Sequence, residues 1–103
     1  MNPDFFRQMQ EMQKRAAELQ KTLAAIEVEG VSGGGLVRAM LNGLGEVKSV
    51  SIDPSLLKPE EQRIVEDLVV AACNDAKTRL EARRAADAQF FTDILKGLGM
   101  GGS

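Results

Sequence analysis

The sequence predicts an α+β fold in which a long helix, a three-stranded antiparallel sheet, a short turn and a second long helix follow one another. Apolar residues recur at helical spacing over residues 5–26. Three short segments between residues 27 and 53 alternate in polarity and are separated by glycine-containing turns. A second helical pattern begins at Pro59. Connections as short as those between the strands favour antiparallel pairing.

The first helix, expected from Pro3 to Ile26, carries one continuous apolar stripe. Its members alternate in spacing of four and three residues: Phe5, Met9, Met12, Ala16, Leu19, Leu23 and Ile26. Such an a/d seam is typical of helices that pack side by side at a shallow angle. Asn2 is suited to cap the helix, Pro3 to its first position, and Asp4 to the positive end of its dipole.

The outer face of this helix also repeats every seven residues. Its bases are Arg7, Lys14 and Lys21. An acidic residue precedes each base by three positions: Asp4, Glu11 and Glu18. Ion pairs at this spacing stabilise a helix by about 0.2–0.5 kcal/mol each. The pattern fits a solvated, salt-bridged face, and it also fits a basic stripe that meets phosphate groups.

The middle of the chain predicts a three-stranded meander. The expected strands are residues 27–32, 36–41 and 46–53. Residues 32–35 and 42–45 are the expected turns, because Gly and Asn tolerate positive φ. The glycine run 33–35 matches neither common phosphate-binding glycine pattern, and a hairpin turn explains it better. One apolar face of the sheet is expected beneath the helices: Val37, Ala39, Leu41, Val50 and Ile52.

Two prolines mark the turn before the second helix and its start. Asp53 and Pro54 predict a capped single turn, and Pro59 followed by two acidic residues opens the long helix. Its apolar stripe is Val65, Leu68, Val69, Ala72, Ala76 and Leu80. The stripe is interrupted at Arg83 and Arg84 and resumes at Phe90, Ile94 and Leu95. We expect residues 1–96 to form a single domain and residues 97–103 to form a flexible, glycine-rich tail.

Both helices are too long for the sheet beside them. At ~1.5 Å per residue they would measure about 35 and 50 Å, whereas strands of ~6 residues span about 20 Å. The uncovered stripes would expose apolar surface that is worth ~25 cal/mol per Å² when buried. We therefore expect a homodimer. The four Phe residues lie at the helix ends, at positions 5, 6, 90 and 91. We expect them to meet, within a chain or between subunits, although independent local packing is the alternative.

The composition excludes several classes of chemistry. The chain has no His and one Cys, so it lacks an imidazole base, an intrachain disulfide and a cysteine-rich zinc site. Cys73 lies in an apolar run and is expected to be a buried structural thiol. Glu27, Glu29 and Asp53 could form a carboxylate group, but no nucleophile accompanies them. We expect no enzyme activity, no metal or cofactor, and no small-molecule substrate.

Location and charge limit the partners. No apolar run approaches the ~18 residues of a membrane span, and the N-terminus lacks the features of an export signal. A cytoplasmic location without a membrane partner is therefore expected. The formal charge is −2, so binding to nucleic acid would require a local basic surface.

Several motifs together resemble the YbaB/EbfC family of bacterial nucleoid-associated proteins. The resemblance covers residues ~5–85 and is carried by residues 9–14, 33–37, 42–43, 52–57 and 66–76, which read MQEMQK, GGGLV, NG, IDPSLL and EDLVVAACNDA. It implies an intertwined, tweezer-like homodimer that binds DNA with little sequence preference. It also implies a place in the nucleoid and an effect on nucleoid organisation and gene expression.

Two functions are compatible with these features. In the first, the paired arms grip duplex DNA through its phosphates, which positions the protein without specifying a sequence. The candidate contacts are Arg7, Lys14, Arg15, Lys21, Lys77, Arg79, Arg83 and Arg84. No aromatic residue lies beside these bases to stack on single strands. In the second, the chain is a helical protein-interaction or scaffold module without direct DNA binding.

Overall fold

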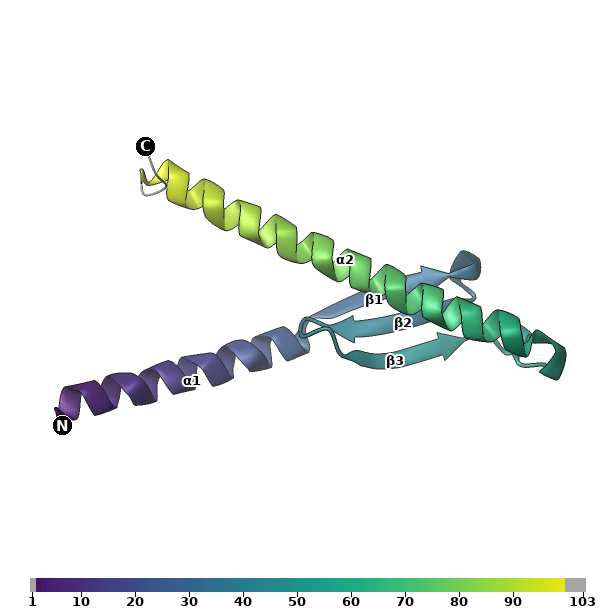
Figure 1. The fold of residues 1–103 in the computed structure, drawn as a ribbon, viewed down its shortest axis with the longest axis horizontal. Helices are drawn as coiled ribbons and strands as arrows, with labels where there is room; N and C mark the ends of the chain where they lie inside the picture. Colours follow the sequence, from purple (N-terminus) through teal and green to yellow (C-terminus); the bar gives the residue numbers. More distant parts are fainter. Residues whose placement is uncertain (1, 100–103) are drawn as a thin grey trace.

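A computed structural model describes residues 2–99 and confirms the expected α+β fold (Figure 1). The helices and strands are α1 (Pro3–Ala25), β1 (Glu27–Ser32), β2 (Val37–Asn42), β3 (Val47–Ile52) and α2 (Gln62–Gly97). Short 3₁₀ turns occupy Gly33–Gly35, Pro54–Leu56 and Pro59–Glu61. The strands pair antiparallel in the order β1-β2-β3. The order of elements is therefore the one that the sequence predicts.

The chain divides into a base and two arms. We call β1–β3 together with α2 as far as Leu80 the base, and we call α1 and residues 81–97 of α2 the arms. Both arms leave the same end of the sheet and diverge (Figure 1). The molecule measures 67 × 38 × 15 Å and has a radius of gyration of 20.4 Å, against about 13 Å for a compact chain of this length. The expected projection of both helices is confirmed.

The core lies between α2 and the first two strands of the sheet. Its buried apolar members are Val28, Val37, Ala39, Leu41, Ala72, Ala76 and Leu80. The helix approaches β1 closely because Gly30 has no side chain. A Cβ at Gly30 would overlap the carbonyl oxygen of Ala72 and the amide nitrogen of Ala76. Alanines on one side and a glycine on the other therefore bring the two backbones into contact.

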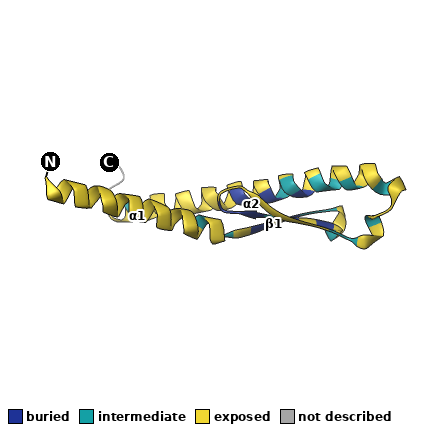
Figure 2. Cartoon of the chain, turned by 90° about the horizontal axis from the view of Figure 1, so that it is seen from below, coloured by how far each residue is buried: buried dark blue, intermediate teal, exposed yellow. Residues whose placement is uncertain are grey.

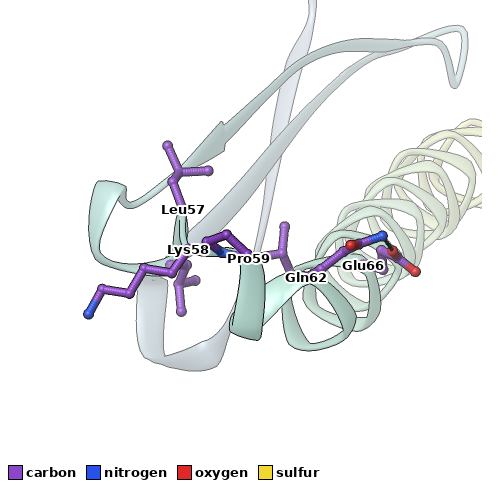
Figure 3. Close-up of a pocket in the computed structure, with 7 residues that line it drawn as sticks. Leu57, Lys58, Pro59, Gln62 and Glu66 are labelled. Carbon is purple, nitrogen blue, oxygen red and sulfur yellow. Dashed lines mark hydrogen bonds between the residues drawn. The ribbon is translucent and has the colours of Figure 1, made fainter.

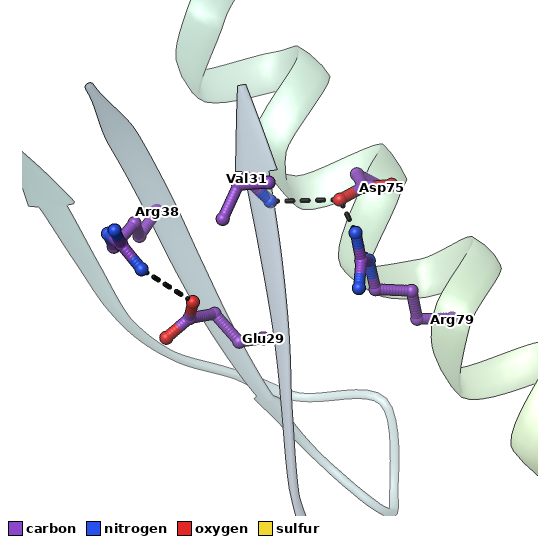
Figure 4. A network of polar contacts seen from close by, with 5 residues as sticks. All are labelled: Glu29, Val31, Arg38, Asp75 and Arg79. Carbon is purple, nitrogen blue, oxygen red and sulfur yellow. Dashed lines mark hydrogen bonds and ion pairs between the residues drawn. The ribbon is translucent and has the colours of Figure 1, made fainter. Parts of the chain in front are cut away.

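Polar contacts lock the outer edge of the sheet to α2. The Val31 N–H donates to Asp75 Oδ2 at 2.9 Å (Figure 4), and the Ser32 hydroxyl donates to the Leu68 carbonyl at 2.6 Å. An open strand edge presents unpaired backbone groups to other chains. Here a helix side chain occupies one of those groups, so this edge of β1 is partly closed.

The cover over the sheet differs from the expectation that both helices supply it. Only α2 packs on the sheet, because α1 extends away from the sheet end and has no buried residue (Figure 2). Val50 shares the inner face with Ala39 and Ile52 as expected, but its side chain is 41% exposed. The inner face of β3 is therefore left largely uncovered in a single chain.

Several local expectations also need correction. The second strand is shifted by one residue to Val37–Asn42, the third is shortened to Val47–Ile52, and pairing is irregular between Met40 and Leu41. The expected opening at Pro59 forms a 3₁₀ turn, and the α-helix itself begins at Gln62.

Two further expectations concern single residues. Cys73 is half-buried rather than buried, because it flanks the stripe centred on Ala72 and Ala76. Gly97 ends α2 instead of beginning the tail, and residues 100–103 of that tail lie outside the described residues.

Candidate nucleic-acid interface

The first arm is an exposed helix, with only Leu23 half-buried, and it has a well-defined start. The Asp4 N–H donates to Asn2 Oδ1 at 3.0 Å, and Pro3 occupies the first turn, as the sequence predicts. At its other end the Gly43 N–H donates to the Leu23 carbonyl at 2.9 Å. No residue of α1 is buried. The whole length of this helix is therefore available to a partner.

The candidate bases of α1 are all exposed: Arg7, Lys14, Arg15 and Lys21. Arg7, Lys14 and Lys21 lie on the face opposite the apolar seam, and Arg15 lies beside the seam. The expected i,i+3 ion pairs with the preceding acids are not formed. Within residues 2–99 the two ion pairs closer than 4.0 Å are Arg38–Glu29 and Arg79–Asp75. The α1 bases therefore hold their charges in solvent, where phosphate could reach them.

The four candidate bases of α2 differ in their surroundings. Lys77 and Arg83 are exposed, and Arg83 continues the face of Ala76 beyond the end of the sheet. Arg79 Nε contacts Asp75 Oδ2 at 3.0 Å (Figure 4). Arg84 Nη2 donates to the Gly43 carbonyl at 2.8 Å. Two of the four bases therefore already have a partner within the chain.

The eight candidate residues do not form one patch in a single chain. Those of α1 occupy one arm, Arg83 and Arg84 begin the other arm, and Lys77 and Arg79 lie on the base. The arms diverge from a common end of the sheet (Figure 1). A ligand that touched both sets would have to lie across the two arms, which an extended polyanion such as a nucleic acid can do.

The carboxylate of Asp75 is the most engaged acid of the base. The Val31 N–H bond lowers its pKa below the ordinary 3.8, and the Arg79 guanidinium lowers it further, against the opposing effect of burial. Hydrogen bonds to the charged form stabilise that form. The charged Asp75 carboxylate therefore links β1 to α2, and it also neutralises part of the positive charge of Arg79.

The proposed carboxylate group of the sequence does not assemble into one site. Asp53 accepts the Ser55 N–H at 2.9 Å as the cap of its turn. Hydrogen bonding to the Ser55 side chain, and then to its backbone N–H, lowers the pKa of Asp53. Glu29 instead pairs with Arg38 Nη1 at 2.9 Å across β1 and β2 (Figure 4). Within the described residues, no group of three or more Cys, Asp or Glu side chains could hold a metal ion.

Concave surfaces lie on the sheet and at the turns that lead into α2. A smaller one of about 200 Å³ on the open face of the sheet is lined by Glu29, Arg38, Ala39, Met40, Ser49 and Ser51. A larger one of about 470 Å³ lies where the 3₁₀ turns meet α2 and is lined by Leu56, Leu57, Lys58, Pro59, Gln62, Val65 and Glu66 (Figure 3). In it, Gln62 donates to Glu66 at 2.9 Å. Both lie away from the arms.

The sequence did not predict a role for two basic residues of the sheet, nor the contact that Arg84 makes within the chain. Arg38 lies on the open face of the sheet, where Glu29 pairs with it, and Lys48 lies on β3 without an ion pair among the described residues. The contact of Arg84 with Gly43 was also missed. No periodicity could reveal it, because it joins residues 41 positions apart.

The arms expose much apolar surface. The chain has 8018 Å² of accessible surface, whereas a compact monomer of its mass exposes about 5,700 Å². The four Phe side chains are 54%, 56%, 67% and 62% exposed at positions 5, 6, 90 and 91. The two Phe pairs lie on diverging arms, so their expected meeting within one chain is wrong (Figure 1). Their meeting between subunits stays a prediction.

No helix in the described part of the chain combines the length and the apolar character that a membrane crossing needs.

Comparison with known proteins points to one family. The sequence model of the YbaB/EbfC DNA-binding family matches residues 1–95. A nucleoid-associated protein of Agrobacterium fabrum is 50% identical over 90 residues, which cover 87% of this chain and 81% of the relative. Another, of Rhodospirillum centenum, is 48% identical over 84 residues, covering 82% of this chain and 78% of the relative. A third, of Bradyrhizobium sp. strain ORS 278, is 45% identical over 98 residues, covering 92% of each chain.

A solved structure shares the fold. It is the crystal structure of an uncharacterized protein from Helicobacter pylori, with a TM-score of 0.63 and 28% sequence identity. The similarity covers 88% of this chain and 97% of that one. The family model and the relatives confirm the resemblance inferred from the sequence motifs.

Proposed function

The chain belongs to the YbaB/EbfC DNA-binding family, and from that premise we propose that it binds duplex DNA as a nucleoid-associated protein. In this proposal the two arms contact phosphates, with little preference for sequence, and the bound protein affects nucleoid organisation and gene expression. Phosphate contacts supply affinity and register without reading base edges. The protein would act in the bacterial cytoplasm, at the nucleoid, without a cofactor and without catalysing a reaction.

One observation supports this proposal above the others. The arms carry exposed bases at regular spacing, and none of the α1 bases has an acid within ion-pairing distance. Because the whole chain has a formal charge of −2, attraction to DNA has to come from such a local surface. A ridge of Arg7, Lys14 and Lys21 on an exposed helix is a local surface of that kind.

The proposal includes a homodimer. The accessible surface of one chain exceeds that of a compact monomer by about 2,300 Å², and obligate dimers bury surface of this order on each partner. The apolar seam of α1, the stripe of Phe90 and Ile94, and the uncovered inner face of β3 are the surfaces that pairing would bury. Sedimentation equilibrium at micromolar concentration should give twice the chain mass, and a folded monomer would contradict this part of the proposal.

The DNA-binding proposal is tested with a salt titration on a random-sequence duplex. If a dimer neutralises ~4–6 phosphates, the slope of log K against log[salt] should be about −4 to −5. Lys14→Gln with Lys21→Gln should weaken binding and make the slope shallower by about 2 to 4, since each base occurs twice in a dimer. The matched control, Glu11→Gln with Glu18→Gln, changes the same number of charges on the same helix and should strengthen binding.

An affinity that responds neither to salt nor to these variants would contradict the proposal. The alternative function, a helical interaction module without DNA, is favoured by the exposed apolar seam of α1. The two are separated by recovering the protein from cells with and without nuclease. Co-purifying protein partners that persist after nuclease treatment, together with no DNA affinity in vitro, would support the alternative.

A further inference from the structure

Both arms are attached to one residue of the β2–β3 turn. The N–H of Gly43 donates to the Leu23 carbonyl near the end of α1, at 2.9 Å. The carbonyl of the same residue accepts from Arg84 Nη2 on α2, at 2.8 Å. The backbone N–H of Gly43 thus binds one arm, and its carbonyl binds the other.

The turn that carries Gly43 is closed by several hydrogen bonds of Asn42. Asn42 is buried, and its Oδ1 accepts the N–H groups of Leu44 and Glu46, each at 3.0 Å. Its Nδ2 donates to Glu46 Oε1 at 2.8 Å. These bonds close the turn on itself. Gly43 therefore contacts both arms from a turn that its neighbours hold closed.

Glycine is required at this position by space rather than by conformation. The φ of Gly43 is not positive. A Cβ there would lie 2.5 Å from the Leu23 carbonyl oxygen and 3.2 Å from the Ile26 Cβ. Any side chain would therefore push the end of α1 off the turn and break its hydrogen bond.

Arg84 lies where α2 leaves the sheet. Leu80, one turn earlier, is the last buried residue of the helix and is 3% exposed. Beyond it, α2 continues without a buried residue, so no sheet contact holds this part of the helix. α1 has no buried residue either. Within one chain, the bonds at Gly43 therefore act on both arms at the point where sheet packing ends.

We propose that Arg84 is a positioning residue, which together with Gly43 sets the angle between the arms, and that it is not one of the DNA contacts. The proposal deepens the DNA-binding function and rests on it, because the angle matters to a ligand only if the ligand lies across both arms. Arg83, its neighbour, makes no such bond in the described residues, and it remains a candidate for phosphate contact.

The test compares Arg84→Gln with Arg83→Gln, which removes the same charge one residue away. Spin labels are placed on exposed positions of the two arms that lie off the apolar seam, at Gln10→Cys and Gln89→Cys, in a Cys73→Ala background. Labelled chains are diluted into unlabelled ones so that the distance within one chain dominates, and that distance is measured without DNA. Arg84→Gln should broaden the distance distribution, Arg83→Gln should not, and Arg84→Lys should partly restore the narrow distribution because a lysine ammonium can still donate to Gly43.

DNA titration gives a second readout that a phosphate contact and a positioning residue affect differently. Arg84→Gln should lower affinity by about three- to tenfold at every salt concentration, because fewer molecules hold the competent arm angle, and it should leave the salt slope unchanged. Arg83→Gln should make the slope shallower by about 1 to 2. A narrow distance distribution in Arg84→Gln, or a slope reduced as in Arg83→Gln, would overturn the proposal. If the wild-type protein fails to bind DNA, the proposed function fails, whereas the distance measurement still decides whether Arg84 holds the arms.

Discussion

The base and the arms use the same kind of helix with opposite outcomes. In α2, Ala72, Ala76 and Leu80 are buried against the sheet, whereas Phe90 and Ile94 continue the same stripe and remain exposed. The stripe is interrupted at Arg83 and Arg84 and resumes on the same face, but there the sheet has ended. An apolar stripe therefore identifies a face that needs a partner, but it does not say whether that partner lies in the same chain.

The polar contacts divide in the same way. At the base, Asp75 and Ser32 are committed to bonds between β1 and α2. On α1, the bases have no ion-pairing acid. The charged group of the base thus holds β1 to α2, whereas the charged groups of α1 remain in solvent, where a ligand is expected to bind.

The largest expected effect breaks the base. Gly30→Val should abolish folding or lower the free energy of unfolding by about 4 kcal/mol or more, because its side chain would overlap the backbone of α2 at Ala72 and Ala76. Urea denaturation measures the change. Gly97→Ala is the matched control, since a Cβ there meets nothing within 4 Å. A Gly30→Val protein as stable as the wild type would show that the helix does not lie on β1.

The next effect acts on the arms. Phe90→Ala with Phe91→Ala should weaken dimerisation by about two orders of magnitude, which corresponds to ~3 kcal/mol, if the exposed Phe side chains are buried between subunits. Sedimentation velocity over a concentration series measures the dissociation constant. Val70→Ala, on the outer side of the base and 60% exposed, should leave it unchanged. An unchanged dimer in the double Phe variant would contradict the expected meeting of the arm tips.

A smaller effect is expected from the protonation of Asp75. The pKa of Asp75 is lowered in the folded state, so its charge stabilises the fold above the ordinary value of 3.8. That contribution is lost as the pH falls through the lowered folded value. The stability advantage of the wild type over Asp75→Asn should therefore be constant above about pH 5 and should shrink below pH 3.8.

Arg79→Gln tests the cause of that shift. It should alter the pH profile less than Asp75→Asn does, because the Val31 N–H bond is the larger cause. Urea denaturation at a series of pH values measures both variants. If the stability advantage of the wild type over Asp75→Asn persisted unchanged at pH 2, the charged Asp75 carboxylate would not be what links β1 to α2.

The smallest effect separates two bases near the boundary of the base. Lys77→Gln and Arg79→Gln should each change the free energy of unfolding by less than about 1 kcal/mol, because exposed charges and exposed ion pairs contribute little. In the DNA titration, Lys77→Gln should make the salt slope shallower than Arg79→Gln does, since Asp75 already occupies Arg79 at 3.0 Å. Equal slopes for the two variants would show that this ion pair opens when DNA binds.

Local order determined much of the fold in advance. The sequence alone predicted the caps at Asn2 and Asp53, the alternation of the strands and the apolar stripe of α2. Each of these features depends on neighbours within a few residues. The length of both helices against a short sheet also predicted the arms. The membership of the family followed from short motifs in the right order.

The tertiary structure alone sets which groups meet across the chain. It left the inner face of β3 uncovered, gave Arg79 and Arg84 partners at Asp75 and Gly43, and kept the arm tips apart. The physical reason is that periodicity reports which face of an element is apolar, within a span of one or two turns. Contacts such as Arg84 with Gly43 depend instead on where two distant backbones cross, and that crossing is set by the packing of α2 on Gly30.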